Sequence, residues 1–535
     1  MNKKIVIGAV AVIAVAGIYA ATRPSKSAKG HTLRVAVQNN ISTLDPNLAD
    51  QVGANWAEVQ TLEGLYTTSA NGKIIPGVAQ KIVQPTQGKK VYTIKLKRNQ
   101  KWSDGSQVTA SDFVNSVKRQ VNPVTKSTRA NHFKDIAGYD AVYNNKENVN
   151  KLGISAPEKY TVKIELSHPV PYFNFILANQ LYPINSDKLK EYGSKYGQTA
   201  KTSVSNGAYT IKKWNQSSTT WEFVKNKYYA DAKNVHYDTI KATQVTDATL
   251  ASKQYLAKKV DEAEISGGIL TDLKKSHATD IKSTQKGRVA FIVWNADDKT
   301  VSNTNLKRAL SLAINRKELT KSALADGSTP AKSIVPSGEV KVDGKDFNAN
   351  FSLPYNKALA QKYLKQAQSE LNQQKITITL NTADTDAYKA LGVYLKQSIE
   401  ATLPDVTINL KQLPLNAEIS AFESHDFQAG TLTWSTDYND PIDFLDIAYS
   451  KGAINFTNWT NSEYEKIINK VSEQHEANDA RYKLEQQAAK LNNDLNGVTP
   501  LYQVSNVHLL RSSVKNLDYP LIGYQNYKYA KWVQR

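Results

Sequence analysis

The chain has 535 residues, 40% hydrophobic and 22% charged, which is enough for three to four domains with large cores and excludes collagen and wholesale disorder. It contains no cysteine, so disulfides, thiol catalysis, iron–sulfur clusters, cysteine-type zinc sites and lipid attachment through cysteine are excluded. The net charge of +19 indicates a lysine-rich soluble surface or an anionic partner, and we favour the former because the basic residues are scattered and no nucleic-acid-binding module is recognisable.

The first thirty residues are typical of an export segment. Lys3 and Lys4 precede the uncharged apolar run 5–21, and a polar stretch follows over residues 22–30. A charged start followed by an apolar run is the pattern of a secretion signal. The run is slightly long for a signal core and slightly short for a membrane span, and Ser25-x-Ser27 is a weak cleavage site. A cleaved signal and a retained membrane anchor therefore both stay open, with the anchor slightly favoured.

The first third of the mature chain has the pattern of an antiparallel sheet. Apolar and polar residues alternate over 33–37, 92–96 and 162–166, which predicts strands with one buried face. Asn71-Gly72 and Asp104-Gly105 are hairpin signals.

The second half of the chain has a different pattern. Apolar residues of segment 306–314 recur at helical spacing, and one of residues 302–304 can cap that helix. Two alternating segments, 376–380 and 406–410, flank a helix-like stretch over 386–403. Strand, helix and strand over this length predict two parallel strands. The mixture of both patterns predicts at least two lobes, with ligands bound at strand ends between them.

Catalytic and cofactor motifs are absent from the sequence. It has no phosphate-binding loop, no dinucleotide-binding glycine motif and no nucleophile elbow. His475-Glu476 is not followed by a second histidine at metalloprotease spacing, and the eight histidines are far apart. We therefore predict no catalytic residue, no cofactor and no metal ligand, and we expect that the protein is not an enzyme.

One polar cluster, residues 434–446, follows an alternating stretch that ends at Trp434. It has three interpretations. An acidic turn that starts a helix explains Asp440 and Pro441 but leaves Asp437 and Trp434 unexplained. A calcium loop is disfavoured because Pro441 and its apolar neighbours break the alternation of ligands. The third interpretation is a carboxylate beside aromatic rings that receives a cationic ligand group, in a bond worth about 1.5–3 kcal/mol.

At these residues the chain resembles the extracellular solute-binding proteins of family 5, the oligopeptide-binding components of bacterial ABC importers. The order and spacing of the matching segments carry the resemblance, which spans almost all of the mature chain. The matching segments are 43–46, 63–66, 71–72, 76–79, 101–105, 108–114, 205–209, 225–229, Asn295, 306–316, 437–441 and 500–502.

The resemblance implies an α/β, two-lobed periplasmic-binding-protein-like fold (type II, cluster C) with an extra domain. After the segment 1–30, a discontinuous domain I would comprise 31–75, 203–290 and 500–535, domain II would be 76–202, and domain III would be 291–499.

The resemblance also implies the site residues. Asp437, which Tyr438 follows, would bind the α-ammonium of a peptide, and Trp434 would line a side-chain pocket. A strand around Gln38 to Ser42 would pair with the peptide backbone. Further contacts are expected near a crossover between the lobes, although hinge packing is the simpler role for its glycine. These backbone-pairing and crossover residues are Asn40, Ile41, Ser42, Asn206, Gly207 and Tyr209.

The resemblance implies that the protein is a monomer that closes around an extracellular peptide and delivers it to an ABC transporter permease. Alternatives are another solute on the same fold (a signalling peptide, an oligosaccharide or a metal complex), a basic cell-surface adhesive protein, or a hydrolase. The chain departs from most Gram-positive relatives because it lacks their lipid-modified cysteine. We expect it at the outer face of the membrane or the cell surface, held by the apolar segment or by charge if it is attached.

Overall fold

The computed structural model describes residues 31–69, 72–452 and 455–533, and the predicted export segment lies outside them. A mixed sheet of 11 strands runs through the molecule, in the order β16-β15-β17-β11-β18-β10-β1-β9-β8-β7, with β12 paired to β18. Its strands are β1 (Thr32–Val37), β7 (Tyr209–Lys212), β8 (Thr220–Lys225), β9 (Thr239–Gln244), β10 (Glu262–Ile265), β11 (Ile281–Trp294), β12 (Thr329–Pro330), β15 (Ile376–Ala383), β16 (Val406–Leu413), β17 (Ala429–Ser435) and β18 (Val498–Leu510).

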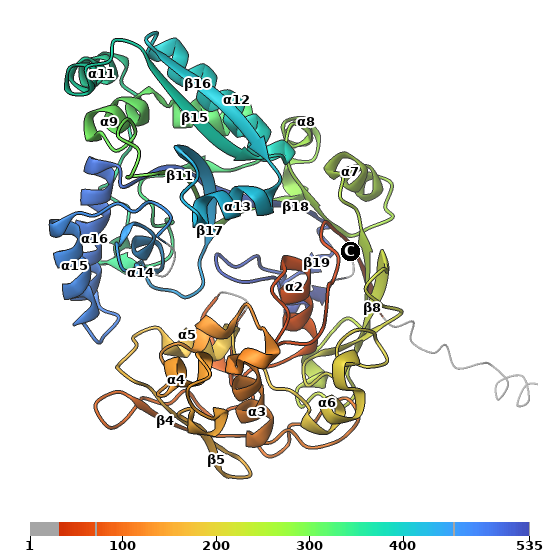
Figure 1. The fold of residues 1–535 in the computed structure, drawn as a ribbon. Coiled ribbons are helices and arrows are strands. Elements are labelled where there is room, and N and C mark those ends of the chain that lie inside the picture. Colours follow the sequence, from red (N-terminus) through yellow and green to blue (C-terminus); the bar gives the residue numbers. More distant parts are fainter. Residues whose placement is uncertain (1–30, 70–71, 453–454, 534–535) are drawn as a thin grey trace, which may run out of the picture.

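The two long strands β11 and β18 join the halves of this sheet. The first part of β11 pairs with the end of β18, beside β10, and the second part of β11 pairs with the start of β18, beside β17. The register shifts between Gln285 and Val289, where the two parts meet. We call the half that contains β1, together with the small domain described below, the first lobe, and the half that contains β15 the second lobe (Figure 1).

The second part of β11 is buried on both faces, which is why residues 289–294 form an unbroken apolar run. Ala290 and Ile292 point into a core that contains α9 (Thr304–Ala313), α11 (Lys357–Leu371) and α12 (Asp386–Thr402). Val289 and Phe291 point into a second core with α14 (Ile442–Leu445), α15 (Ser462–Ser472) and α16 (Asp479–Leu495). Figure 1 shows these two groups of helices on either side of the strand.

The strand–helix–strand prediction for the second half of the chain is confirmed. β15 and β16 are parallel and in register from Ile376 and Val406 onward, and α12 connects them. The predicted helix of the 306–314 segment is α9, and its cap is Asn303, whose side chain accepts a hydrogen bond from Leu306 N at 2.9 Å.

The antiparallel prediction for the first third is confirmed for the strands after residue 65, but it is wrong for β1, which is parallel to both β9 and β10. β4 (Val91–Lys95), β6 (Thr161–Glu165) and β5 (Ile154–Glu158) form a separate three-stranded sheet, and β2 (Tyr66–Thr68) pairs with β3 (Ile74–Pro76) across the predicted hairpin. Helices α3 (Ala110–Val121), α4 (Tyr139–Tyr143), α5 (Phe173–Asn179) and α6 (Ser186–Tyr192) accompany the small sheet. These elements form the small domain at the bottom of Figure 1.

The remaining elements complete the two lobes. In the first lobe they are α2 (Val52–Thr61), α7 (Ala248–Leu256), α8 (Ile269–Ser276), β19 (Val514–Lys515) and β20 (Lys531–Trp532). In the second they are α10 (Arg316–Glu318), α13 (Leu415–Glu423), β13 (Lys341–Val342) and β14 (Lys345–Asp346). Of the residues described, no helix combines the length and the apolar character needed to cross a membrane.

Candidate functional site

The end of β17 carries the predicted cluster toward the small domain. Trp434 packs against the core that contains α14, α15 and α16, and its indole nitrogen Nε1 donates to Asp443 Oδ1 at 3.3 Å. The other oxygen of the same carboxyl, Oδ2, accepts from the backbone nitrogen of Asp437 at 2.6 Å. Asp443 itself is buried and belongs to α14, which starts just after Pro441. The acidic turn therefore holds in place the indole of Trp434 and the backbone of Asp437, the residue that is expected to bind the ligand.

The Asp437 side chain is partly buried and lines a cavity of about 50 Å³ between the two lobes. Neither of its carboxylate oxygens has a hydrogen-bond or ion-pair partner among the residues that the structure describes. The second lobe contributes Trp434, Asp437, Tyr438, Asp443, Asp446 and Ile447 to the cavity wall, and the small domain contributes Asn131, His132, Lys134, Asp135, Tyr172 and Ile176.

The electrostatics of the cavity depend mainly on burial. Burial raises the pKa of Asp437 to about 6, and the positive charges of Arg129 and Lys134 oppose this rise. Burial, reinforced by the charge of Asp437, also raises the pKa of Asp443 well above its usual value. Burial and the Arg129 charge lower the pKa of His132 to about 3, so its ring is neutral at physiological pH. A cationic group that enters the cavity would stabilise the ionised form of these carboxyls.

Asp440, in the same loop, is a carboxylate with a permanent ion-pair partner. Its two oxygens accept from Nη2 and Nε of Arg481 at 2.8 and 3.0 Å, and both side chains are buried. Asp440 Oδ1 also accepts from the backbone nitrogen of Ile442 at 3.2 Å, as expected for a residue that starts a helix. The two aspartates therefore differ in kind: Arg481 neutralises Asp440, whereas Asp437 faces a cavity.

The lobes touch each other around this cavity. The rings of Tyr172 and Tyr438 stack with their centroids 3.9 Å apart. Gln180 Nε2 donates to the carbonyl of Asp437 at 3.3 Å, and Gln180 Oε1 accepts from Arg129 Nη2 at 2.9 Å. Farther out, the exposed side chains of Lys89 and Glu476 form an ion pair. In this structure the small domain therefore rests on the second lobe.

The predicted residues at the crossover lie away from this cavity. The Asn206 side chain is buried and makes hydrogen bonds with both the backbone nitrogen and the carbonyl of Glu63, at 3.0 and 2.9 Å. A Cβ atom on Gly207 would lie 2.7 Å from the backbone of Leu62, and Tyr209 is fully buried. In this structure the crossover residues hold two segments of the first lobe together.

The segment expected to pair with a peptide is not a strand in this structure. β1 ends at Val37 and lies inside the sheet between β9 and β10, so residues 38–42 continue as irregular backbone. Asn40 is exposed, whereas Ile41 is buried in the core of the first lobe. The Ser42 hydroxyl is buried without a partner among the described residues, and the Ser42 carbonyl accepts from Gln216 at 2.8 Å.

The sequence does not reveal which residues of the small domain lie against the candidate site. His132 lies on a short 3-10 helix, Tyr172 and Gln180 flank the two ends of α5, and no motif singles them out. Asp443 lies within the predicted polar cluster 434–446, but nothing in the sequence assigns it contacts with other residues of the cluster. Its contacts with Trp434 and with the backbone of Asp437 depend on how the turn closes, which residue spacing does not reveal.

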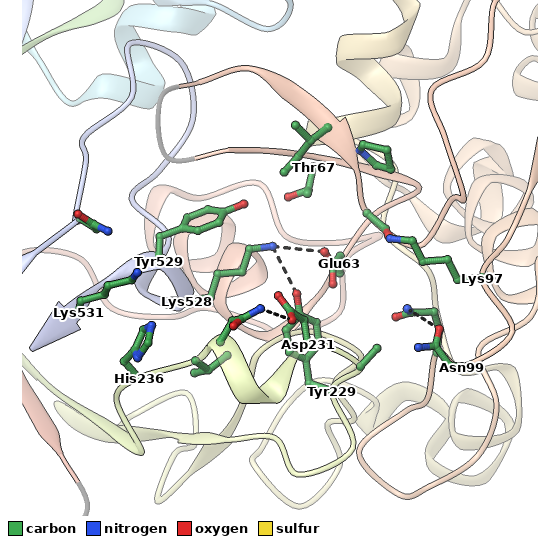
Figure 2. Close-up of a pocket in the computed structure, with 18 of the residues that line it drawn as sticks. Glu63, Thr67, Lys97, Asn99, Tyr229, Asp231, His236, Lys528, Tyr529 and Lys531 are labelled. Carbon is green, nitrogen blue, oxygen red and sulfur yellow. Dashed lines mark hydrogen bonds and ion pairs between the residues drawn. The ribbon is translucent and has the colours of Figure 1, made fainter.

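A larger cavity, of about 670 Å³, lies elsewhere, within the first lobe (Figure 2). Lys528 and Glu63 form an ion pair of 3.3 Å in it, and Lys528 Nζ lies 3.5 Å from the Tyr229 hydroxyl. The lining comes from the small domain, the connection between β8 and β9 and the C-terminal segment, all in the first lobe, so this cavity is not bounded by both lobes. Because Asp437 and its neighbours do not line it, we keep the smaller cavity between the lobes as the candidate site.

Comparison with known proteins adds a family and several relatives. The sequence profile of the bacterial extracellular solute-binding proteins, family 5, matches residues 73–456. A dipeptide-binding protein of Lactococcus lactis is 29% identical over 84% of this chain and 84% of its own length. The structure is similar to that of Listeria monocytogenes OppA bound to peptide, with a TM-score of 0.79, 28% identity and coverage of 95% of this chain and 100% of the other. It is equally similar to the substrate-binding domain of an oligopeptide ABC transporter from Bacillus anthracis, with a TM-score of 0.79, 29% identity and coverage of 95% and 100%.

Proposed function

Because this chain belongs to the bacterial extracellular solute-binding proteins of family 5, we propose that it binds extracellular peptides between its lobes and delivers them to the permease of an ABC importer. The relatives named as peptide-binding proteins, and the solved structures that match 95% of the chain, support this substrate and this partner. We expect no chemical change in the peptide.

The observation that carries the proposal is the Asp437 carboxyl in the cavity between the lobes. A carboxylate that is partly buried without an ion-pair partner is unfavourable in the empty protein. The α-ammonium of a peptide would supply the missing charge and up to three hydrogen-bond donors. The unpartnered Nδ1 of His132, in the opposite wall, is a second acceptor for such a group.

Binding and closure would then be linked. The peptide would be held by residues of both lobes, so it has more contacts in the closed form than in the open form. A ligand shifts such an equilibrium by the difference between its affinities for the two forms. The closed form would be the one that the permease receives.

Calorimetric titration with short peptides tests the proposal. Replacement of Asp437→Ala should cost on the order of 2 kcal/mol, or roughly thirtyfold in affinity, for peptides with a free amine. N-acetylated peptides should bind weakly to both proteins, because they have no ammonium group. An equal loss for acetylated and free peptides would remove the assigned role of Asp437. If no peptide binds but a sugar, bile acid or metal complex does, the peptide proposal is wrong.

A further inference from the structure

The cavity of about 670 Å³ within the first lobe has no part in the proposed function. It lies where the small domain meets the connection between β8 and β9 and the C-terminal segment. Ligand pockets usually have volumes of about 300–1,000 Å³ and often lie where domains meet. Asn99, His236 and Asn516 line the cavity and are exposed, so it is open to solvent. It therefore has the size and the access of a second binding site.

An ion pair with long contacts lies in the middle of this cavity (Figure 2). Lys528 Nζ lies 3.3 Å from Glu63 Oε1 and 3.5 Å from the Tyr229 hydroxyl, whereas an ammonium–carboxylate hydrogen bond is usually about 2.7–2.9 Å long. Burial lowers the pKa of Lys528, but Glu63 and the neighbouring tyrosines raise it by more, so the ammonium keeps its charge. Burial raises the pKa of Tyr229, so its hydroxyl keeps its proton. The group can therefore both donate hydrogen bonds to a ligand and accept them from it.

The charges of the cavity lining balance, because it contains three lysines and three acidic residues: Lys97, Lys528, Lys531, Glu63, Asp231 and Asp518. This balance contrasts with the net charge of +19 for the whole chain. Lys97 Nζ already donates to the carbonyl of Gly77 at 2.7 Å. Asp231 Oδ1 already accepts from Asn234 Nδ2 at 2.6 Å. A charged ligand would meet attraction and repulsion together, so the lining favours a neutral ligand.

Much of the remaining lining is neutral and of two kinds. Its amide and hydroxyl side chains are Thr67, Asn99, Gln100, Asn234 and Asn516. An amide carries donors and an acceptor side by side, which suits adjacent hydroxyl groups of a ligand. Ile75, Pro76, Val235 and the ring of Tyr529 supply apolar surface. Because a sugar ring has hydroxyl groups at its edge and C–H groups on its faces, it matches both kinds of lining.

We propose that this cavity is a second ligand site, which binds a neutral oligosaccharide independently of the peptide site. One sugar hydroxyl would accept from Lys528 Nζ and donate to Glu63, and would thus bridge two groups whose direct contact is long. No bond of the sugar changes. A soluble sugar and the glycan of a cell wall offer the same chemistry. Because the cavity lies within the first lobe, sugar and peptide can be held at the same time.

Calorimetry with four trisaccharides tests the preference for a neutral ligand. Maltotriose and triacetylchitotriose are neutral, chitotriose is cationic when its amines are protonated, and trigalacturonate is anionic. At least one neutral sugar should bind, roughly tenfold more tightly than either charged sugar. Binding of maltotriose alone would indicate a soluble sugar, and binding of triacetylchitotriose alone would indicate an acetylated wall glycan. If neither neutral sugar binds, or if a charged sugar binds more tightly, the proposal is wrong.

A pair of tryptophan variants locates the bound sugar. Ala230→Trp places an indole at an exposed position of the lining and should abolish sugar binding. Ala257→Trp makes the same change at an exposed position of the first lobe outside the lining, and should leave sugar binding unchanged. Thermal unfolding shows that each variant is folded. Sugar binding that survives in Ala230→Trp would overturn the proposal.

Two further variants test the ion pair and its neighbour. Tyr229→Phe removes one hydroxyl and should weaken sugar binding roughly two- to tenfold. Glu63→Gln keeps the shape of the side chain but leaves the charge of Lys528 unbalanced, so it should shift the preference toward trigalacturonate. A folded Glu63→Gln variant with the preference of the wild type would show that the sugar does not bind at the ion pair.

Trialanine separates this site from the peptide site. The affinity for the sugar should be the same with and without saturating trialanine, and it should be unchanged in Asp437→Ala. Ala230→Trp should bind trialanine as the wild type does. Displacement of the sugar by trialanine would place the sugar between the lobes and would overturn the second site. The outcome does not depend on the proposed function, because sugar binding is also measured without peptide.

Discussion

At the scale of single residues, the decisive contrast lies within one loop. Asp437 and Asp440 are three positions apart, yet Arg481 neutralises the one and the other faces a cavity. A carboxylate whose pKa is raised by burial is an efficient receptor for a cation, because the ligand removes an existing penalty. This argument predicts a specific dependence of affinity on pH.

Peptide affinity should fall at low pH because Asp437 must be ionised to bind an ammonium group. Its pKa in the empty protein is about 6, so below pH 6 the affinity should drop by about tenfold per pH unit. Between about pH 6 and 8 it should be nearly constant, and above pH 8 it should fall as the peptide amine loses its proton.

Calorimetry from pH 4.5 to 9 on wild type and Asp437→Asn measures both limbs. The acid limb should disappear in the variant and the alkaline limb should remain. The other ionisable groups that line the cavity are Asp135, Asp443, Asp446, Lys134, His132, Tyr172 and Tyr438. An acid limb that survives in the variant would assign the titration to one of the three aspartates instead.

At the scale of elements, α16 holds the loop in place through Arg481. Beside its bonds to Asp440, Arg481 Nη1 donates to the carbonyls of Val471 and Gln474 at 2.7 and 3.1 Å, and Nε lies 3.2 Å from Glu485. These groups are buried or partly buried, so the arginine satisfies charges and carbonyls that water cannot reach. The loop that carries Asp437 therefore depends on a helix that is distant in sequence.

Arg481→Met should destabilise the protein by about 3–5 kcal/mol, because it leaves buried carboxyls without their partner. Urea unfolding followed by tryptophan fluorescence measures the change. Lys490→Met on the same helix removes an exposed partner of Asp494 and should cost no more than about 1 kcal/mol. Equal losses in both variants would contradict the assignment. Adding Asp440→Asn to Arg481→Met should recover part of the stability.

At the scale of the whole molecule, the sheet is continuous, but its two halves meet at a register shift in β11, which we call the joint. β11 and β18 pass through both lobes, and the register shift at residues 285–289 divides the ladder between them into two parts. The contacts between the small domain and the second lobe include the Tyr172–Tyr438 stack and the Lys89–Glu476 pair. Movement about the joint would separate the small domain from the second lobe and open the candidate site.

Peptide should therefore increase the fraction of molecules in which residues 89 and 476 are close. Because the natural sequence has no cysteine, Lys89→Cys with Glu476→Cys creates a unique pair of thiols. A short bismaleimide should cross-link this pair faster when a short peptide is present, as measured by the shift in gel mobility. Adding Asp437→Ala should abolish the increase at the same peptide concentration. Cross-linking that peptide leaves unchanged would argue against ligand-dependent closure.

The sequence by itself determined the local elements and the family. Alternation predicted β1, β4 and β6, helical spacing predicted α9, and the strand–helix–strand pattern predicted a parallel pair, because each depends on neighbours within a few residues. The motif order identified the family, and the 434–446 cluster was recognised as a candidate site before any contact was known.

Only the tertiary structure decided which polar residues have partners. Asp437 and Asp440 look alike in the sequence, but Arg481, 41 residues after Asp440, neutralises only one of them. The irregular path of residues 38–42 and the cavity wall formed by His132 and Tyr172 are equally invisible to residue patterns. The physical reason is that the energy of a charge depends on its burial and on the charges beside it, and both are set by segments that only folding brings together.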